Sequence, residues 1–235
     1  MPLPSLVSPE FNITLPSNKK DITYRPFTVK EQKALLIAKE SNEPKEVINI
    51  TQKVVAECCD IPLEEVQKMP YFDIEWIFLH IRSKSIGEDF KFIMSNGEGS
   101  ECDASTEVTF ALEDIKFELD KSQSNDIKIS DDIGITFEYP NFFDMGTFSD
   151  ISNPMVMYNF IVAKMKTVWD NDRVYDDFTK TEAEKFIDSL NTDQYSKILR
   201  WFNNIPVLTH KFKWTCKVCK KESEMILTGL NDFFL

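Results

Sequence analysis

The sequence has few of the residues that enzymes most often use for covalent chemistry. Only two of its 235 residues are histidines, His80 and His210. It contains no glycine-rich phosphate loop, no G-x-S-x-G motif and no H-E-x-x-H motif. Because no convergent set of catalytic side chains is visible, we expect a protein that is not an enzyme and that has no small-molecule substrate.

The chain also lacks a long apolar run and an excess of positive charge. No stretch approaches the roughly 20 apolar residues of a membrane span. The N-terminal stretch "MPLPSLVSPEFNITLP" has neither the basic region nor the apolar run of a signal peptide. With 27 Lys and Arg against 39 Asp and Glu, the net charge is −12, which repels a phosphate backbone. We therefore expect no membrane span, no signal peptide and no nucleic-acid partner.

Cysteine is scarce and odd in number. Five cysteines without a framework spacing are typical of a reducing compartment. A hydrophobic fraction of 42% and 19 phenylalanines favour a packed globular protein over a disordered one. These features predict a soluble intracellular protein with a sizeable core.

The apolar pattern along the chain predicts an α+β fold, because runs of strands and runs of helices do not alternate. The expected order is an N-terminal β-hairpin and then two helical blocks, each followed by a β-rich, cysteine-bearing knuckle. We expect one compact unit. Its segments are the hairpin at 1–28, the first helical block at 29–89, a β-rich region at 90–140, a loop at 141–153, the second helical block at 154–206 and a C-terminal knuckle at 207–235.

Local signals within the second helical block refine this expectation. Pro154 can open a helix, and "TEAE" at Thr181–Glu184 has the form of a capping box. Thr192 is the expected cap of the last helix. One apolar helical face is formed by Met157, Ile161, Val162, Met165, Val168 and Trp169.

Two segments of the chain repeat one pattern. "FKFIMSNGEGSECDASTEVTFALEDI" and "FKWTCKVCKKESEMILTGLNDF" each contain an aromatic-Lys-aromatic strand, a turn, a cysteine and a second strand. The triplet T-E-V follows Cys102 at the same offsets as S-E-M follows Cys219. When the first strands, which begin with Phe-Lys in both copies, are matched, Met94 occupies the place of Cys216. The echo indicates a duplication in which one copy lost a thiol.

The cysteines of this repeat predict one structural zinc ion. A C-x2-C pair on a β-turn, here Cys216 and Cys219, is the commonest way to offer two of four zinc ligands. If the two echoing turns face each other, Cys102 is the third ligand. Met94 is a poor ligand for zinc. The alternatives for the fourth position are His210, Cys58 and Cys59.

Three other interpretations of the cysteines stay open. They could be ordinary buried thiols left after loss of a metal. "WTCKVC" could be a dithiol redox pair, but a thioredoxin-like motif needs a long helix after it, and the residues after Cys219 read as a strand. A zinc-ribbon nucleic-acid binder would use the lysines of Lys211–Lys221, which would also favour thiolates. The net charge argues against that binder.

Two segments carry motifs that point to a family. "FNITLPSNKKDITYRPFTVKEQKALLIAKES" joins a short hairpin to an R-P-F-x-V-K-E-x-K helix start, through Arg25, Pro26, Phe27, Val29, Lys30, Glu31 and Lys33. "MPYFDIEWIFLHIRSKSIGE" holds a second motif, through Pro70, Asp73, Glu75, Phe78, Leu79, Arg82, Lys84, Ser85, Gly87 and Glu88. With "FIDSLNTDQYSKILRWFNNIPVLTH" and the final C-x-x-C before "GLNDFF", they resemble, in order, the T-even-type phage baseplate hub assembly proteins.

The resemblance covers nearly the whole chain and implies a role. It implies a late viral protein made in the host cytoplasm and needed to build the hub of a contractile-tail baseplate. The family includes a proposed hub subunit, which would lie in the virion tail, and a proposed assembly catalyst that acts as a chaperone. Its members usually carry a cysteine where Met94 stands.

The expected partners are hub or tape-measure proteins of the phage. The helices at Lys30–Lys39 and Ile74–Lys84 each offer a charged face beside apolar surface suited to a partner helix. The residues expected to bind a partner are Arg25, Phe27, Lys30, Glu31, Arg82 and Lys84.

Overall fold

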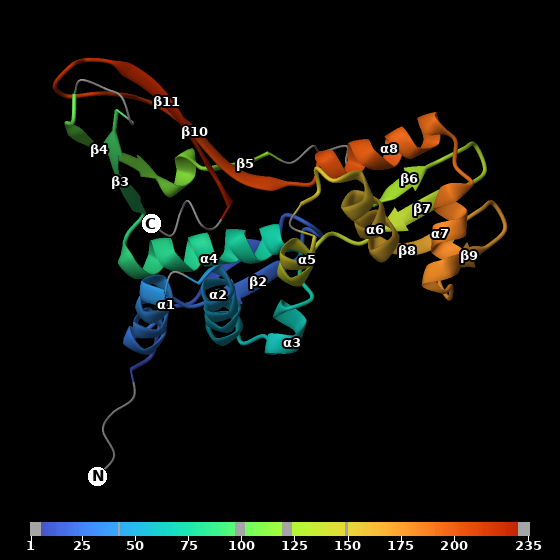
Figure 1. The fold of residues 1–235 in the computed structure, drawn as a ribbon. Coiled ribbons are helices and arrows are strands. Elements are labelled where there is room, and N and C mark those ends of the chain that lie inside the picture. Colours follow the sequence, from blue (N-terminus) through green and yellow to red (C-terminus); the bar gives the residue numbers. More distant parts are fainter. Residues whose placement is uncertain (1–5, 42, 97–101, 119–123, 149, 230–235) are drawn as a thin grey trace, which may run out of the picture. The chain divides into compact units, whose positions relative to one another are not determined.

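A computed structural model describes residues 6–41, 43–96, 102–118, 124–148 and 150–229. The fold is α+β, as the sequence predicts, with helices and small antiparallel sheets in separate runs (Figure 1). Residue contacts divide the chain into two compact units, where the sequence analysis expected one. Unit 1 comprises Met1–Lys68, Phe72–Glu118 and Val207–Leu235, and unit 2 comprises Met69–Tyr71 and Leu119–Pro206.

Unit 1 begins with the predicted hairpin. Strands β1 (Phe11–Thr14) and β2 (Asp21–Tyr24) pair antiparallel, with Ile13 opposite Ile22. Four helices follow, namely α1 (Val29–Ser41), α2 (Pro44–Cys59), α3 (Leu63–Val66) and α4 (Tyr71–Ile86). The backbone N–H of Arg25 donates to the carbonyl of Cys58 at 2.9 Å, which ties the end of the hairpin to the end of α2.

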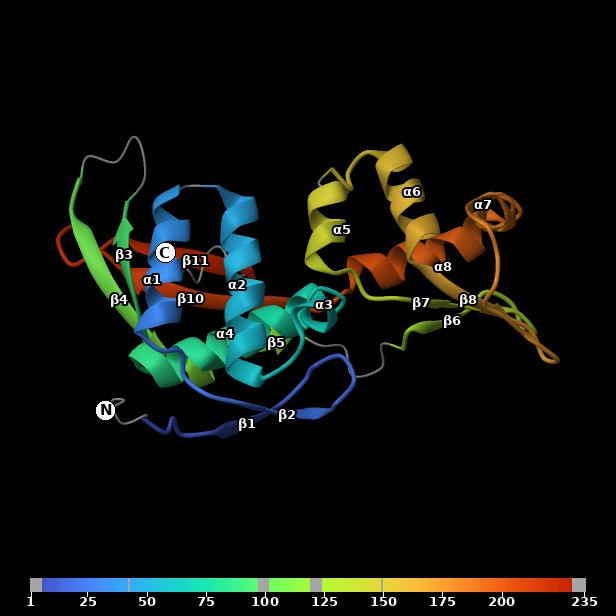
Figure 2. The ribbon, with the colours of Figure 1, turned by 90° about the horizontal axis from the view of Figure 1, so that it is seen from below.

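Helix α4 is the centre of unit 1, because it is apolar around most of its circumference. Ile74, Ile77 and Ile81 have no exposed surface, and Leu79 is 1% exposed. A helix of this kind must be covered on several sides. In Figure 1 the helices α1 and α2 lie on one side of α4, and the strands that follow α4 in unit 1 lie on the other. Figure 2 shows the hairpin of β1 and β2 beside α4.

The other strands of unit 1 form two further antiparallel sheets. Strands β3 (Asp89–Ser95) and β4 (Ser105–Ala111) make one hairpin. The second sheet has the order β11 (Glu222–Thr228), β10 (Val207–Thr215), β5 (Lys116–Glu118), and a 3-10 turn at Leu112–Asp114 precedes β5. Both sheets and α4 share one core cluster, formed by Leu79, Phe90, Phe110, Ile115, Leu208 and Leu227.

Unit 2 packs four helices on a four-stranded antiparallel sheet. The sheet order is β6 (Asp126–Lys128), β7 (Gly134–Phe137), β8 (Met165–Trp169) and β9 (Val174–Tyr175). The helices are α5 (Phe142–Thr147), α6 (Pro154–Lys164), α7 (Lys180–Asp188) and α8 (Thr192–Asn203). Their shared core includes Ile135, Phe137, Phe160, Ile161, Ile198 and Trp201.

The prediction of a loop at 141–153 is wrong at α5. Asn141 Oδ1 accepts from the backbone N–H of Asp144 at 3.0 Å, and Asp144 Oδ2 accepts from the N–H of Asn141 at 2.9 Å. This reciprocal cap starts a helix despite Gly146. Asp144 also forms a buried ion pair with Lys164, 2.7 Å long, which anchors α5 to α6.

The predicted apolar helix face after Pro154 is wrong beyond Lys164. Residues Met165–Trp169 form strand β8, and Val168 pairs with Ile135 of β7. The apolar residues Met165, Val168 and Trp169 are spaced three or four residues from others of the predicted face, but they belong to this strand. The caps are also shifted, since Thr179 and Glu182 form the capping box of α7, and Asn191 caps α8.

Gly134 gives a direct test of the packing in unit 2. A Cβ atom at this position would lie 2.1 Å from Cζ2 of Trp169, the residue opposite it on β8. We expect Gly134→Ala to lower the free energy of unfolding by about 1–3 kcal/mol in a urea titration, because the indole must move. Gly146→Ala is the matched control. Its Cβ meets nothing within 4 Å, and it should leave stability unchanged or raise it by up to about 1 kcal/mol. Equal effects of the two substitutions would contradict this packing.

Candidate functional site

The structure brings together the three cysteines predicted to bind metal. Cys102 lies just before β4, and Cys216 and Cys219 lie in the turn between β10 and β11. Their three sulfur atoms all lie within 4.8 Å of one another, and the Sγ atoms of Cys102 and Cys216 are 3.9 Å apart. We call these three residues the thiol cluster. None of the five cysteines, all in the described part of the chain, forms a disulfide.

Asn96, which the sequence analysis did not single out, faces the thiol cluster. Its Nδ2 atom lies 3.3 Å from Cys216 Sγ and 3.5 Å from Cys219 Sγ. It also donates to the carbonyl of Cys102 at 3.3 Å. The Oδ1 atom of Asn96 is buried and has no hydrogen-bond partner among the described residues. Asn96 and Cys102, at the end of the β3–β4 hairpin, therefore meet Cys216 and Cys219 of the β10–β11 turn.

The strand registers explain why Asn96 stands there. The last pair of the β3–β4 hairpin is Ser95 with Ser105, and the last pair of the β10–β11 hairpin is Thr215 with Glu222. When these end pairs are matched, Asn96 takes the place of Cys216, and Cys102 takes the place of Cys219. The sequence alignment that put Met94 at that place is two residues out of register. Met94 itself lies inside β3, opposite Thr106.

The turn between β10 and β11 favours a thiolate at Cys216. The hydrogen bond from the Asn96 side chain and the bonds from the backbone amides of Cys219 and Val218 lower the pKa of Cys216 to about 6. At Cys102 the backbone amide of Ala104 lowers the pKa, but burial and the neighbouring thiols outweigh it, and the pKa is raised. The cluster thus already stabilises one negative sulfur near neutral pH.

The other candidates for a fourth ligand lie elsewhere. His210 Nδ1 is 3.0 Å from the carbonyl oxygen of Asp114, and its ring lies 4.0 Å from the ring of Phe110. Cys58 and Cys59 end helix α2, where burial raises the pKa of Cys58 to about 11 and that of Cys59 to about 12. Among the described residues, the thiol cluster is the one group of three or more His, Cys, Asp or Glu side chains close enough together to hold a metal ion.

Two of the predicted partner-binding residues contact each other. Arg25 Nη2 and Glu31 Oε1 form an ion pair 3.0 Å long, and Glu31 is only 4% exposed. Glu31 Oε2 accepts from the backbone N–H of Thr28 at 2.7 Å and from the Thr28 hydroxyl. These bonds fix the first turn of α1, so this part of the motif has a structural role.

The other four predicted partner residues also have neighbours within unit 1. The N–H of Phe27 donates to Ser85 Oγ at 2.9 Å, and the Arg82 guanidinium lies 4.1 Å above the ring of Phe90. Lys30 and Lys84 form exposed ion pairs with Glu57, at 2.8 Å, and with Glu88. Partner binding by the six residues stays a prediction.

Between α1 and α4 lies a groove of about 220 Å³. Two apolar side chains that line it are largely exposed, Leu36 at 54% and Ile86 at 60%. Contiguous exposed apolar surface commonly marks an interaction site. The groove is lined by Phe27, Gln32, Leu35, Leu36, Lys39, Phe78, Arg82 and Ile86.

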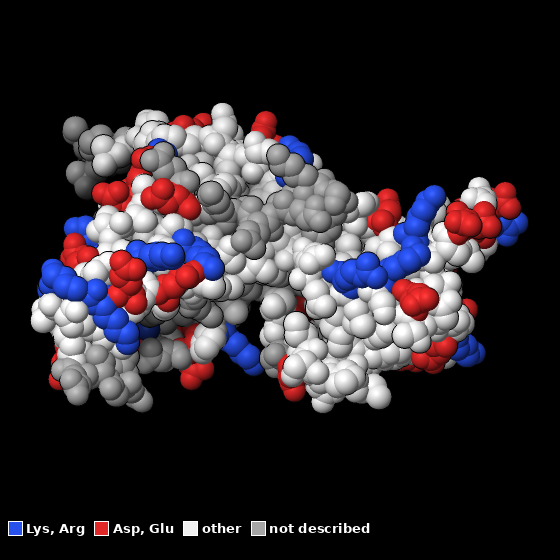
Figure 3. Space-filling model, turned by 90° about the horizontal axis from the view of Figure 1, so that it is seen from above, with Lys and Arg blue, Asp and Glu red and all other residues white. Residues whose placement is uncertain are grey.

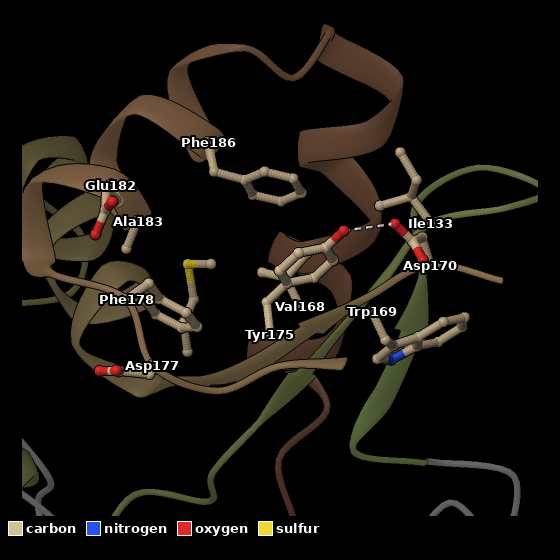
Figure 4. Close-up of a pocket in the computed structure, with 11 residues that line it drawn as sticks. Ile133, Val168, Trp169, Asp170, Tyr175, Asp177, Phe178, Glu182, Ala183 and Phe186 are labelled. Atoms are coloured by element: carbon tan, nitrogen blue, oxygen red, sulfur yellow. Dashed lines mark hydrogen bonds between the residues drawn. The ribbon is translucent and has the colours of Figure 1, made fainter. Parts of the chain in front are cut away.

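A larger pocket, of about 410 Å³, lies in unit 2 between β8, β9 and α7. Figure 4 shows the rings of Tyr175, Phe178 and Phe186 around it. Two of its three carboxylates, those of Asp170 and Glu182, are engaged, since Asp170 accepts from the Tyr175 hydroxyl at 2.9 Å and Glu182 caps α7. The pocket therefore presents a mainly apolar wall. The sequence does not predict this pocket, because the spacing of Val168 and Trp169 suits a helix.

Comparison with known proteins gives one match. A family model described as T4 bacteriophage base plate protein matches residues 8–235, nearly the whole chain. No curated protein and no solved structure matches the chain. In the described part of the chain, no helix has both the length and the apolar character that crossing a membrane requires.

The Arg25–Glu31 pair predicts a pH dependence. Burial opposes the charge of Glu31, but the bonds from Thr28 and Arg25 prevail and lower its pKa from 4.5 to about 2. The carboxylate thus stabilises the fold above pH 4.5, and this contribution is lost as the pH falls toward 2. We expect Glu31→Gln to lower the free energy of unfolding by about 2 kcal/mol at pH 7.

Urea unfolding at pH 7, 4 and 3 would measure this effect, with the difference between variant and parent shrinking as the pH falls. Lys30→Gln, which breaks an exposed ion pair on the same helix, serves as the control and should change little at any of these pH values. A difference for Glu31→Gln that is independent of pH would contradict the assignment.

Proposed function

The chain belongs to the T4 bacteriophage base plate protein family, and from this premise we propose that it builds the central hub of a contractile-tail baseplate. Membership gives a role connected with the baseplate. The finer proposal is that the protein is either a minor hub subunit or an assembly factor that holds other subunits while they join. It would act without catalysis, in the host cytoplasm, before the tail is complete.

The observation that carries this proposal is the apolar surface of α1 beside the groove. Leu35 and Ala38 are buried, at 7% and 3% exposed, whereas Leu36, which also lines the groove, is 54% exposed. A surface helix normally has one apolar stripe and one polar face. An exposed leucine outside the buried stripe suits a partner protein that covers it during assembly.

The charges around the groove favour a particular kind of partner. Lys39 and Arg82 line it, and α1 also carries Lys30 and Lys33. An apolar helix or segment flanked by carboxylates would complement this surface in shape and charge. A hub or tape-measure protein of the phage is the class of partner that we propose.

The charge distribution gives less support to a nucleic-acid partner. On the face of unit 1 seen in Figure 3, blue Lys and Arg side chains lie among red Asp and Glu side chains. Lys211, in the basic stretch considered for nucleic acid, forms an ion pair with Glu224 at 2.6 Å. The net charge is −12. Interspersed charges of both signs do not make the continuous basic surface that phosphate binding needs.

The surroundings of the two histidines also favour a non-enzymatic role. His80 packs against Trp76, with ring centres 4.4 Å apart, and burial lowers its pKa to about 4. It is therefore neutral and enclosed at physiological pH. His210 lies among Phe110 and Phe212. Each ring contributes to packing, which fits a protein that works through its surface.

The groove can be tested by one substitution and a matched control. We expect Leu36→Glu to reduce recovery of hub and tape-measure proteins at least tenfold in quantitative pull-downs from infected cells, because a carboxylate would enter an apolar, basic-rimmed contact. Ile226→Glu is the control. Ile226 is 52% exposed, close to the 54% of Leu36, but lies on β11. It should leave recovery unchanged.

Thermal unfolding of both variants should match the parent protein, since both side chains are half exposed. Equal recovery with Leu36→Glu and the parent would contradict binding at the groove. Mass spectrometry of purified particles beside the lysate then separates the two proposed roles. A hub subunit is present at a few copies per particle, and an assembly factor is abundant in lysate and missing from particles.

A further inference from the structure

The distances around the thiol cluster match those of a tetrahedral zinc site. With zinc–sulfur bonds of about 2.3 Å, two sulfur ligands of a tetrahedron lie about 3.8 Å apart. The Sγ atoms of Cys102 and Cys216 are 3.9 Å apart. The third sulfur, from the exposed Cys219, lies within 4.8 Å of both. A small side-chain rotation of Cys219 closes this triangle.

Asn96 stands at the fourth corner. A sulfur and an oxygen ligand of the same tetrahedron lie about 3.6 Å apart. The amide nitrogen of Asn96 is 3.3 Å from Cys216 Sγ and 3.5 Å from Cys219 Sγ. A half-turn about the Cβ–Cγ bond exchanges the amide nitrogen and oxygen, and it would place Oδ1 at this corner. In the present rotamer, Oδ1 is buried without a hydrogen-bond partner among the described residues.

We propose that the turns of the two hairpins hold one zinc ion, bound by the thiolates of Cys102, Cys216 and Cys219 and by the side-chain amide oxygen of Asn96. The register supports the assignment independently of the distances, because Asn96 holds in the first hairpin the place that Cys216 holds in the second. The site is a pseudo-symmetric pair of knuckles in which one thiolate is replaced by an amide oxygen.

The ion would have a structural role. The β3–β4 and β10–β11 hairpins belong to separate sheets. Near their turns, Lys217 N–H donates to Thr106 Oγ1 at 3.1 Å. The zinc ion would add four bonds from both hairpins at this point. Three thiolates and one divalent ion leave a net charge of −1, which the lysines of the β10–β11 turn (Lys217, Lys220 and Lys221) would offset. This inference does not depend on the baseplate role.

The test uses the full chain, purified under reducing conditions without chelator. Elemental analysis should find one zinc per chain. Cobalt(II) titration should give the sulfur-to-metal charge-transfer band and the visible bands of a tetrahedral site with three thiolates. Cys102→Ser should abolish stoichiometric binding. Where that variant fails to fold, zinc is removed from the parent protein with a chelator and then added back. This compares the zinc-free and zinc-bound states of the same chain.

Two substitutions separate the structural register from the register suggested by the sequence. Asn96→Cys should tighten zinc binding at least about tenfold in competition with a chromophoric chelator, since it completes a four-thiolate site. Asn96→Ala should weaken binding by about tenfold or more. Met94→Cys is the matched control and should leave the affinity unchanged, because residue 94 lies inside β3, two residues before the site.

Three results would overturn the proposal. The first is a reduced parent protein that binds no zinc. The second is an Asn96→Ala variant with the affinity and cobalt spectrum of the parent, which would remove Asn96 from the site. The third is a Met94→Cys variant that tightens binding as much as Asn96→Cys does, which would restore the register suggested by the sequence.

Discussion

The burial of helix α4 is the constraint on which unit 1 depends. A helix that is apolar over most of its surface cannot face water on any broad side, and both the helical layer and the strand layer of the unit satisfy this requirement. Polar atoms of α4 then fix the neighbouring segments. Asp73 accepts from the backbone N–H of Ser17 at 3.0 Å, and Ser85 accepts from the N–H of Phe27 at 2.9 Å. The groove and the two hairpins are therefore positioned from one buried element.

This organisation explains what the family motifs report. Glu31, Asp73 and Ser85 all belong to the motifs that resemble hub assembly proteins, and each of them forms hydrogen bonds inside unit 1. The motifs thus specify the start of α1 and the hydrogen bonds that hold neighbouring segments against α4. In the proposed role, contact with other baseplate proteins would come from surface that these bonds leave exposed, such as Leu36 at the groove between α1 and α4. A resemblance carried by buried polar residues identifies the family well, and it says less about which surface meets a partner.

The sequence predicted the hairpins of the thiol cluster but placed one of them two residues out of register. Alternation of side chains has a period of two, so a shift by two keeps every apolar residue on its own face and leaves no trace in the pattern. The lengths of the two turns decide the register, and they differ, since residues 96–104 join β3 to β4 and residues 216–221 join β10 to β11. Asn96 was missed for this reason. The grouping of Cys102 with Cys216 and Cys219 was predictable because Cys102 and Cys219 lie at the same offset before the second strand of their hairpins.

The errors in unit 2 have a different cause. Met165 and Val168 have a spacing that suits both a helix face and a buried strand, and the pairing of β8 with β7 decides between them. At α5, the cap between Asn141 and Asp144 outweighs the loop-like composition around it. In both places tertiary contacts or a reciprocal cap select the structure.

The measurement that tests the account most directly is assembly of the phage that encodes this chain after its gene is interrupted. Electron microscopy of lysates would count baseplates and complete tails, with the gene supplied in trans as the control. The account predicts that hubs and tails fail to form, that heads accumulate, and that the intact gene restores assembly. Tailed, infectious particles in normal numbers without the protein would contradict a role in building the hub.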